Sequence, residues 1–166
     1  MSNLDRFRAA QDAPHAGFAA ALRELKAGRK TGHWIWYVLP QLVGLGRSST
    51  AVYYGLADAQ EAADYLRDPV LGERLIAAAA AVRSHLAAPN VRPMRIAELM
   101  GSEIDALKLV SCMTLFRHVG SALYAVDPQP QFAAMTEHAD AILAAAAEQG
   151  YDLCAHTEEH VRRPRP

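Results

Sequence analysis

The stretch Gly28–Ser49, GRKTGHWIWYVLPQLVGLGRSS, differs in composition from the rest of the chain. It contains both tryptophans, three basic side chains, a histidine, four glycines and a Pro-Gln pair. The sequence on either side is rich in alanine and carries apolar residues at helical spacing. We therefore expect a helical scaffold around this stretch and the functional surface within it.

The apolar segment 33–39, HWIWYVL, does not reveal its own secondary structure. A short apolar run is compatible with a buried strand or a buried helix. Pro40 disfavours helical geometry at Leu39 and marks a boundary there. We favour a short helix because no partner strand is evident elsewhere, with a loop at Gly44 and Gly46.

The flanking segments show the usual signals of helix ends. Before the central stretch, apolar residues recur from Phe18 to Leu25 with Glu24 outside, and Gly28 ends the helix. After it, 51–56 is expected as a connection, and capping residues precede the later helices. These helices are expected to begin at Asp58, Asp68 and Ser102, with further ones at 95–100 and 132–148.

These segments predict an all-α fold. Residues 1–150 are expected to form a single domain of about six to eight helices, in an orthogonal array rather than a simple bundle. Residues 151–166 are expected to form a polar, flexible tail. The tail motif HTEEH places His156 and His160 four residues apart, which on a helix permits metal binding, but a solvated tail is favoured.

Net charge, apolar runs and cysteine spacing each argue against certain classes of function. The net charge is -1 and the pI is about 6.6, so we expect no nucleic-acid partner. The longest apolar run is too short to span a bilayer, and the first residues do not resemble a secretory signal. Cys112 and Cys154 suggest neither a disulfide framework nor a metal site. We expect a cytoplasmic protein without metal or cofactor, and the oligomeric state stays open.

The basic residues of the central stretch point to an anion. Arg29, Lys30, His33 and Arg47 flank glycines, whose backbone amides can approach an oxyanion, and Ser48 adds a hydroxyl group. The spacing is not that of a nucleoside-triphosphate loop. The alternative is that these charges complement the end of a helix, which is favoured for Lys30, whereas a pocket is favoured for Arg29 and His33.

Two further groups of residues complete the candidate site. Trp36 either stacks a ligand or belongs to the core, and we expect one tryptophan in the core and the other in a cleft. Gln41 either contacts a ligand or satisfies the following loop. In the later segment KLVSCMTLF, Lys108 and Ser111 share a helical face, as anion ligands or as a Ser-Lys catalytic pair. The alternatives are that Lys108 reaches water and that Ser111 bonds to its own helix.

The motifs LDRFRAAQ, GRKTGHWIWYVLPQLVGLGRSS, YLRDPVLGERL and KLVSCMTLF, in this order, resemble the bacterial domain family DUF1810. Some members of that family carry a calpastatin label that we regard as mistaken. The resemblance covers roughly residues 4–117 and implies a mainly helical single domain, without an established activity. The family pattern includes Gly28, Arg29, Lys30, His33, Trp34, Trp36, Pro40, Gln41, Ser48, Lys108 and Ser111.

Two functional hypotheses follow. The first is a pocket for a small phosphate- or carboxylate-bearing ligand, in which Arg29 and Lys108 hold the charge, Trp36 stacks and His33 donates a hydrogen bond or shuttles a proton. It requires these side chains to converge on one concave space. The second is an interaction module that docks a protein partner or a second copy through the tryptophan-rich stretch. Neither hypothesis identifies a reaction.

Overall fold

The protein is all-α in the computed structural model, which describes residues 3–163. The described residues form ten helices and no strand. One isolated parallel bridge joins Leu42, in the second half of the central stretch, to Leu56. The helices are α1 Asp5–Gln11, α2 Phe18–Ala27, α3 Ile35–Val38, α4 Ser49–Tyr54, α5 Ala59–Arg67, α6 Pro69–Leu86, α7 Ile96–Met100, α8 Glu103–Val126, α9 Pro130–Glu148 and α10 Ala155–Arg162.

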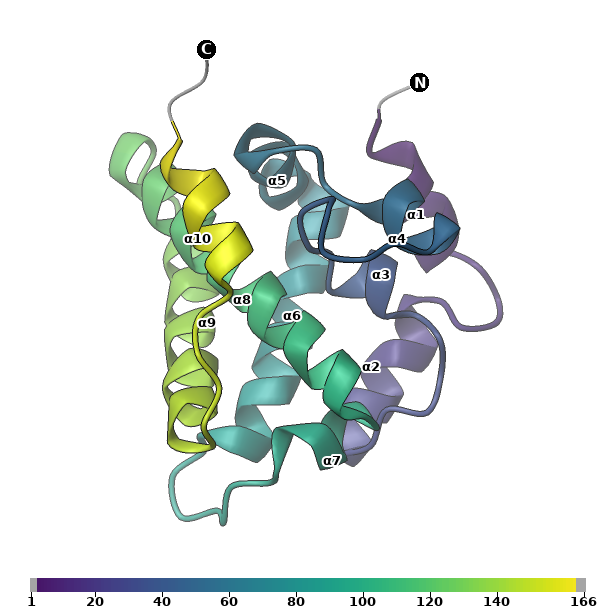
Figure 1. Cartoon of the computed structure of the whole chain (residues 1–166), viewed down its shortest axis with the longest axis vertical. Helices are drawn as coiled ribbons and strands as arrows, with labels where there is room; N and C mark the ends of the chain where they lie inside the picture. Colours follow the sequence, from purple (N-terminus) through teal and green to yellow (C-terminus); the bar gives the residue numbers. More distant parts are fainter. Residues whose placement is uncertain (1–2, 164–166) are drawn as a thin grey trace.

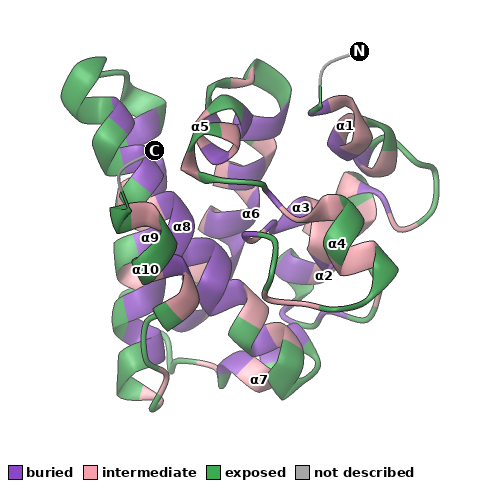
Figure 2. Ribbon diagram, turned by 45° about the horizontal axis from the view of Figure 1, so that its top comes forward, coloured by how far each residue is buried: buried purple, intermediate pink, exposed green. Residues whose placement is uncertain are grey.

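Helix α8 forms the centre of the fold (Figure 1). It packs most extensively against α9 and also contacts α5, α7 and α10, while α6 packs against α9, α5 and α2. The buried residues of these helices face one another and form one continuous core, whereas the outer faces are exposed (Figure 2). This packing fixes the backbone of α8 and therefore which of its residues face the one side that other helices leave open.

The composition of α8 reflects its central position. Its length and apolar character would suffice for a membrane-spanning helix, and it is the only described helix that meets both conditions. However, 61% of its most apolar window is buried inside the fold. Its hydrophobicity is therefore accounted for by packing against neighbouring helices.

Most helix ends follow the sequence signals. The side chain of Asp58 accepts a hydrogen bond from the backbone N–H of Glu61, and that of Asp68 accepts from the two residues after Pro69. Ser102 likewise caps α8. Gly28 has a φ of 82° at the end of α2, the left-handed geometry that glycine adopts without strain. These contacts confirm the predictions. Helix ends of this kind are predictable because each depends only on neighbouring residues.

Two helices were not expected from the sequence. Segment 51–56, expected as a connection, belongs largely to α4, which Ser48 caps by accepting a hydrogen bond from the N–H of Ala51 at 3.1 Å.

The expectation of a flexible tail needs correction for α10. Its Thr157 is buried, and the backbone N–H of Cys154 donates to Thr114 on α8 at 3.3 Å. Contacts with α8 stabilise a segment whose own composition is polar.

Candidate functional site

The central stretch begins with a loop that the carboxylate of Glu24 organises. This carboxylate accepts hydrogen bonds from the backbone N–H groups of Thr31 and Gly32 at 3.0 Å and from the indole N–H of Trp34 at 2.7 Å. Burial alone would raise the pKa of Glu24, but these hydrogen bonds outweigh it and lower the pKa to about 2. Glu24, expected on the outer face of α2, is thus the residue that shapes the loop.

The same loop is held from the other side by the turn between α7 and α8. The backbone N–H of Lys30 donates to the carbonyl oxygen of Leu99 at 2.8 Å. Gly101 has a φ of 82°, and a Cβ atom there would lie 2.7 Å from the carbonyl oxygen of Lys30. These contacts turn the side chain of Lys30 inward and the residue as a whole is 7% exposed, while Arg29 is exposed on the surface.

Lys30 and Lys108 share one carboxylate. One oxygen of Asp105 lies 2.8 Å from the Lys30 ammonium, and the other lies 3.5 Å from the Lys108 ammonium. No other carboxylate of the described chain lies within ion-pair distance of either lysine. We call these three residues the lysine–aspartate cluster, and it retains one uncompensated positive charge.

Each lysine of the cluster also lies over a tryptophan ring. The ammonium of Lys30 is 5.0 Å from the ring centroid of Trp34, and that of Lys108 is 4.8 Å from that of Trp36. Trp34 is fully buried, whereas Trp36 is half-buried. The prediction that one tryptophan lies in the core is therefore confirmed for Trp34. Trp36 does not line a cleft directly but supports a lysine that does.

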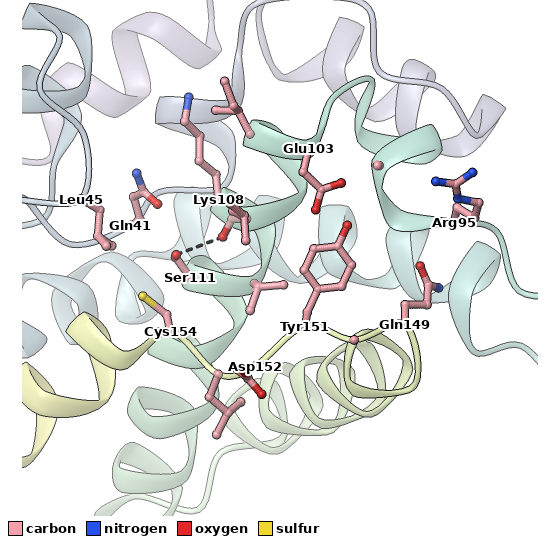
Figure 3. Close-up of a pocket in the computed structure, with 16 residues that line it drawn as sticks. Gln41, Leu45, Arg95, Glu103, Lys108, Ser111, Gln149, Tyr151, Asp152 and Cys154 are labelled. Carbon is pink, nitrogen blue, oxygen red and sulfur yellow. Dashed lines mark hydrogen bonds between the residues drawn. The ribbon is translucent and has the colours of Figure 1, made fainter.

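A groove of about 960 Å³ runs along the open face of α8, which we call the α8 groove (Figure 3). Helix α8 forms one wall and segment 149–154, between α9 and α10, forms the other. The loop of the central stretch that carries Gln41 and Leu45 closes one end, and the start of α7 lies at the other. The lining residues are Gln41, Leu45, Arg95, Ala97, Glu103, Ile104, Leu107, Lys108, Val110, Ser111, Gln149, Gly150, Tyr151, Asp152, Leu153 and Cys154.

The two ends of the groove differ in their polar groups (Figure 3). Gln41, Lys108, Ser111 and Cys154 gather at one end. At the other end the hydroxyl group of Tyr151 points toward the carboxylate of Glu103. Burial raises the pKa of Tyr151, and the hydrogen bond with Glu103 and the charge of that carboxylate raise it further. Tyr151 is therefore a neutral donor to Glu103 at physiological pH.

The side chains of Gln41 and Ser111 have different environments. The Gln41 amide makes no hydrogen bond to another described side chain or backbone group, although its backbone carbonyl accepts from Leu56 at 3.0 Å. The hydroxyl group of Ser111 donates to the carbonyl oxygen of Leu107 at 3.0 Å, as its helical position suggested. It makes no hydrogen bond to Lys108, so the geometry is not that of a Ser-Lys catalytic pair.

The nine candidate residues do not converge as expected. Gln41, Lys108 and Ser111 line the groove, and Lys30 and Trp36 contact its wall through the lysine–aspartate cluster. The other four lie outside it: Arg29, His33 and Arg47 are exposed, and Ser48 is exposed and serves as a helix cap. The preference for Arg29 and His33 over Lys30 therefore needs correction, because the backbone contacts at Leu99 and Gly101 select which side chain turns inward.

Several groove residues carried no signal that sequence reasoning could use. Segment 149–154 follows the last alanine-rich helix and lacks a recognisable motif. Arg95 falls in the expected helix 95–100 and Glu103 at the start of the helix expected from Ser102, and neither position by itself indicates a groove. Asp105 was visible three residues after the capping Ser102, but its partnership with Lys30 depends on the tertiary fold.

The histidines of the HTEEH motif have structural contacts. A ring nitrogen of His156 lies 3.2 Å from the carbonyl oxygen of Val43, and one of His160 lies 2.7 Å from the carbonyl oxygen of His156. Within the described residues, no group of three or more His, Cys, Asp or Glu side chains is arranged to hold a metal ion. The motif thus fastens α10 to the loop at Val43.

Comparisons with known proteins identify a family and a solved structure with a similar fold. The family model "Protein of unknown function (DUF1810)" matches residues 1–139. The crystal structure of the conserved hypothetical protein Rv1873 from Mycobacterium tuberculosis is similar, with a TM-score of 0.74 and 37% sequence identity. That match covers 95% of this chain and 94% of the other. Among curated proteins none matches the chain.

Proposed function

The chain belongs to the DUF1810 family, and we propose that it binds a small phosphate- or carboxylate-bearing ligand at the Lys108 end of the α8 groove. The observation that carries the proposal is the charge of the lysine–aspartate cluster. Two ammonium groups share the carboxylate of Asp105, and the side chain of Lys30 is only 6% exposed. An anion beside Lys108 would neutralise the remaining positive charge in a partly desolvated place, where electrostatic attraction is stronger than in water.

Neighbouring polar groups support an oxyanion at this end. The Gln41 amide has a free N–H group among the described residues, and the Ser111 hydroxyl lies on the same face of α8 as Lys108. The volume of about 960 Å³ lies at the upper end of the range for small-molecule sites. Both features fit a ligand larger than an inorganic ion, held by one anionic group.

The proposal changes the roles first considered for the basic residues. Lys108 holds the charge of the ligand, while Lys30 and Asp105 position Lys108 from inside the fold. Trp36 supports the Lys108 ammonium through its ring face rather than stacking the ligand. Arg29, His33 and Arg47 are outside the groove and have no part in this site.

The alternative, docking of a protein through the tryptophan-rich stretch, has less support. Trp34 is fully buried and Trp36 is half-buried beneath Lys108, so the stretch offers little exposed aromatic surface.

A cytoplasmic location also belongs to the proposal, and the two free cysteines, Cys112 and Cys154, fit a reducing compartment.

A thermal-shift screen against nucleotides, sugar phosphates and small carboxylates tests the proposal. A ligand present at a hundred times its Kd should raise the Tm by on the order of 5 to 10 °C. Lys108→Met, which keeps the apolar stem, should lose most of this shift. Arg29→Ala is the matched control and should keep it, because Arg29 is exposed outside the groove. A blank screen, or a shift lost only in Arg29→Ala, would contradict the proposal.

A further inference from the structure

One wall of the α8 groove is a backbone segment that is fixed at both ends. The Gln149 amide accepts from the N–H of Ile96 at 2.9 Å and donates to the carbonyl oxygen of Met94 at 2.8 Å. At the other end the N–H of Cys154 donates to Thr114 at 3.3 Å. Segment 149–154 is therefore held in place on both sides of its central residues.

The central residues of this wall have unused backbone groups. Within residues 3–163, neither Asp152 nor Leu153 makes a backbone hydrogen bond to another residue, whereas the N–H of Tyr151 donates to Ala146 at 3.0 Å. The segment runs without helical structure between α9 and α10 (Figure 1). Backbone donors and acceptors that are fixed but unpaired can add main-chain hydrogen bonds to an extended peptide.

Both walls of the groove offer exposed apolar side chains, most of them on α8. Ile104 and Leu107 on α8 are 68% and 54% exposed, and Leu153 is 39% exposed. All three line the groove, together with the buried Val110. Large apolar side chains that remain this exposed along a concave surface are characteristic of binding sites. The groove thus combines an apolar helix face with a polar backbone edge.

Charge distinguishes the two ends of this arrangement. The Lys108 end carries the excess positive charge of the lysine–aspartate cluster. The other end carries Glu103 together with Arg95, and Asp152 adds a carboxylate between the two ends, so no excess positive charge gathers away from Lys108. A ligand with a single terminal anionic group would therefore be oriented with that group at Lys108.

We infer that the α8 groove binds a short peptide in extended conformation, with its free C-terminal carboxylate at Lys108. The peptide backbone pairs with Asp152 and Leu153, and its apolar side chains contact Ile104 and Leu107. A simple organic anion lacks this combination of a peptide backbone, apolar side chains and a terminal carboxylate. The inference rests on the proposed function, because it specifies the anionic ligand of the same site.

The test uses the tripeptide acetyl-Leu-Ala-Leu with a free carboxylate, measured by isothermal titration calorimetry on the full chain. Two changes to the peptide are compared: amidation of the C-terminus and N-methylation of the central amide. Each should weaken binding about tenfold, the value of one good hydrogen bond or charge contact. Inorganic phosphate and acetate serve as reference anions and should bind more weakly than the tripeptide.

Protein variants separate the contributions of the walls. Leu107→Asn should weaken the tripeptide about tenfold or more, since it removes apolar contact at the groove without adding charge beside Lys108, and phosphate binding should be retained. Val52→Asn is the matched control, because Val52 has the same exposure of 54% but lies on α4 outside the groove. Lys108→Met should remove the difference between the free and amidated peptides.

The outcomes distinguish this inference from the proposed function. If phosphate or acetate binds in a Lys108-dependent manner but the tripeptide binds no better than acetate, the peptide inference is overturned and the anion site stands. Equal binding of the N-methylated peptide also overturns it. If none of the probes binds, both proposals fail. Concentration-dependent association that Leu107→Asn abolishes would identify a second copy as the occupant and overturn the inference.

Discussion

The ammonium group of Lys30 lies 2.8 Å from a carboxylate oxygen of Asp105, and both side chains are largely shielded from water. This ion pair joins the central stretch to the first turn of α8. The second oxygen of Asp105 lies 3.5 Å from Lys108, so the pair also determines where the groove lysine is held. A stabilising contact inside the fold and the charge of the candidate site therefore depend on one carboxylate.

Removing this carboxylate should destabilise the protein. Asp105→Asn leaves the ammonium of Lys30 without a counter-charge in a buried place, which we expect to lower the free energy of unfolding by roughly 2–4 kcal/mol. Urea denaturation measures the change. Asp140→Asn is the control, because Asp140 is exposed and lies 3.9 Å from Arg117, so its loss should cost less than about 1 kcal/mol. Equal effects of the two substitutions would contradict the importance of the buried pair.

Glu24 should make the stability depend on acidic pH. Its pKa is lowered from 4.5 to about 2 in the folded state, so ionised Glu24 stabilises the fold above pH 4.5. This contribution should be lost as the pH falls from about 4.5 to about 2. The free energy of unfolding of the wild type should therefore exceed that of Glu24→Gln at pH 6, and the difference should shrink toward pH 2. A difference that is constant over this range would show that Glu24 is not ionised in these contacts.

The turn at Gly101 provides a test of the contact that holds the loop containing Lys30. Gly101→Ala should be strained by its φ of 82° and by a Cβ atom 2.7 Å from the carbonyl oxygen of Lys30. We expect a loss of stability of about 2–4 kcal/mol, from the left-handed backbone and the displaced loop together. Gly150→Ala isolates the backbone term, since Gly150 has a φ of 90° with open space around it. It should cost about 1–2 kcal/mol, and an equal loss at both glycines would refute the close contact with Lys30.

The two thiols should differ in reactivity. Cys112 is fully buried, and burial raises the pKa of its thiol, so little reactive thiolate forms. Cys154 is partly exposed and lines the α8 groove. Iodoacetamide at pH 8 should label Cys154 alone in the native protein and both residues after unfolding, as measured by mass spectrometry of peptides. Rapid labelling of Cys112 in the native state would contradict the packing around α8.

The sequence predicts local structure well because caps and helix stops involve neighbouring residues. Asp58, Asp68 and Ser102 cap their helices as expected, and Gly28 adopts the left-handed geometry that ends α2. The hydroxyl groups of Ser111 and Thr114 bond to their own helix for the same reason.

The candidate site was less predictable because it depends on contacts between distant segments. Arg29 and Lys30 are adjacent basic residues, and the sequence does not show which side chain faces inward. In the fold the backbone of Lys30 bonds to Leu99 and lies against Gly101, and its ammonium pairs with Asp105. The second wall of the groove, 149–154, is joined to the first only in the folded chain. The polar composition of residues 151–166 predicted a flexible tail, but α10 forms there because its contacts with α8 stabilise it.

The most direct test of the central claim is a two-dimensional ¹H–¹⁵N NMR titration of the full chain with inorganic phosphate. If the ligand site is the Lys108 end of the α8 groove, the largest chemical-shift changes should occur at Gln41, Lys108 and Ser111 and along 150–154. Lys108→Met should abolish these changes. Saturable shifts confined to the exposed residues 29–33 and 47–48, unaffected by Lys108→Met, would contradict the claim and place the anion on the basic loop instead.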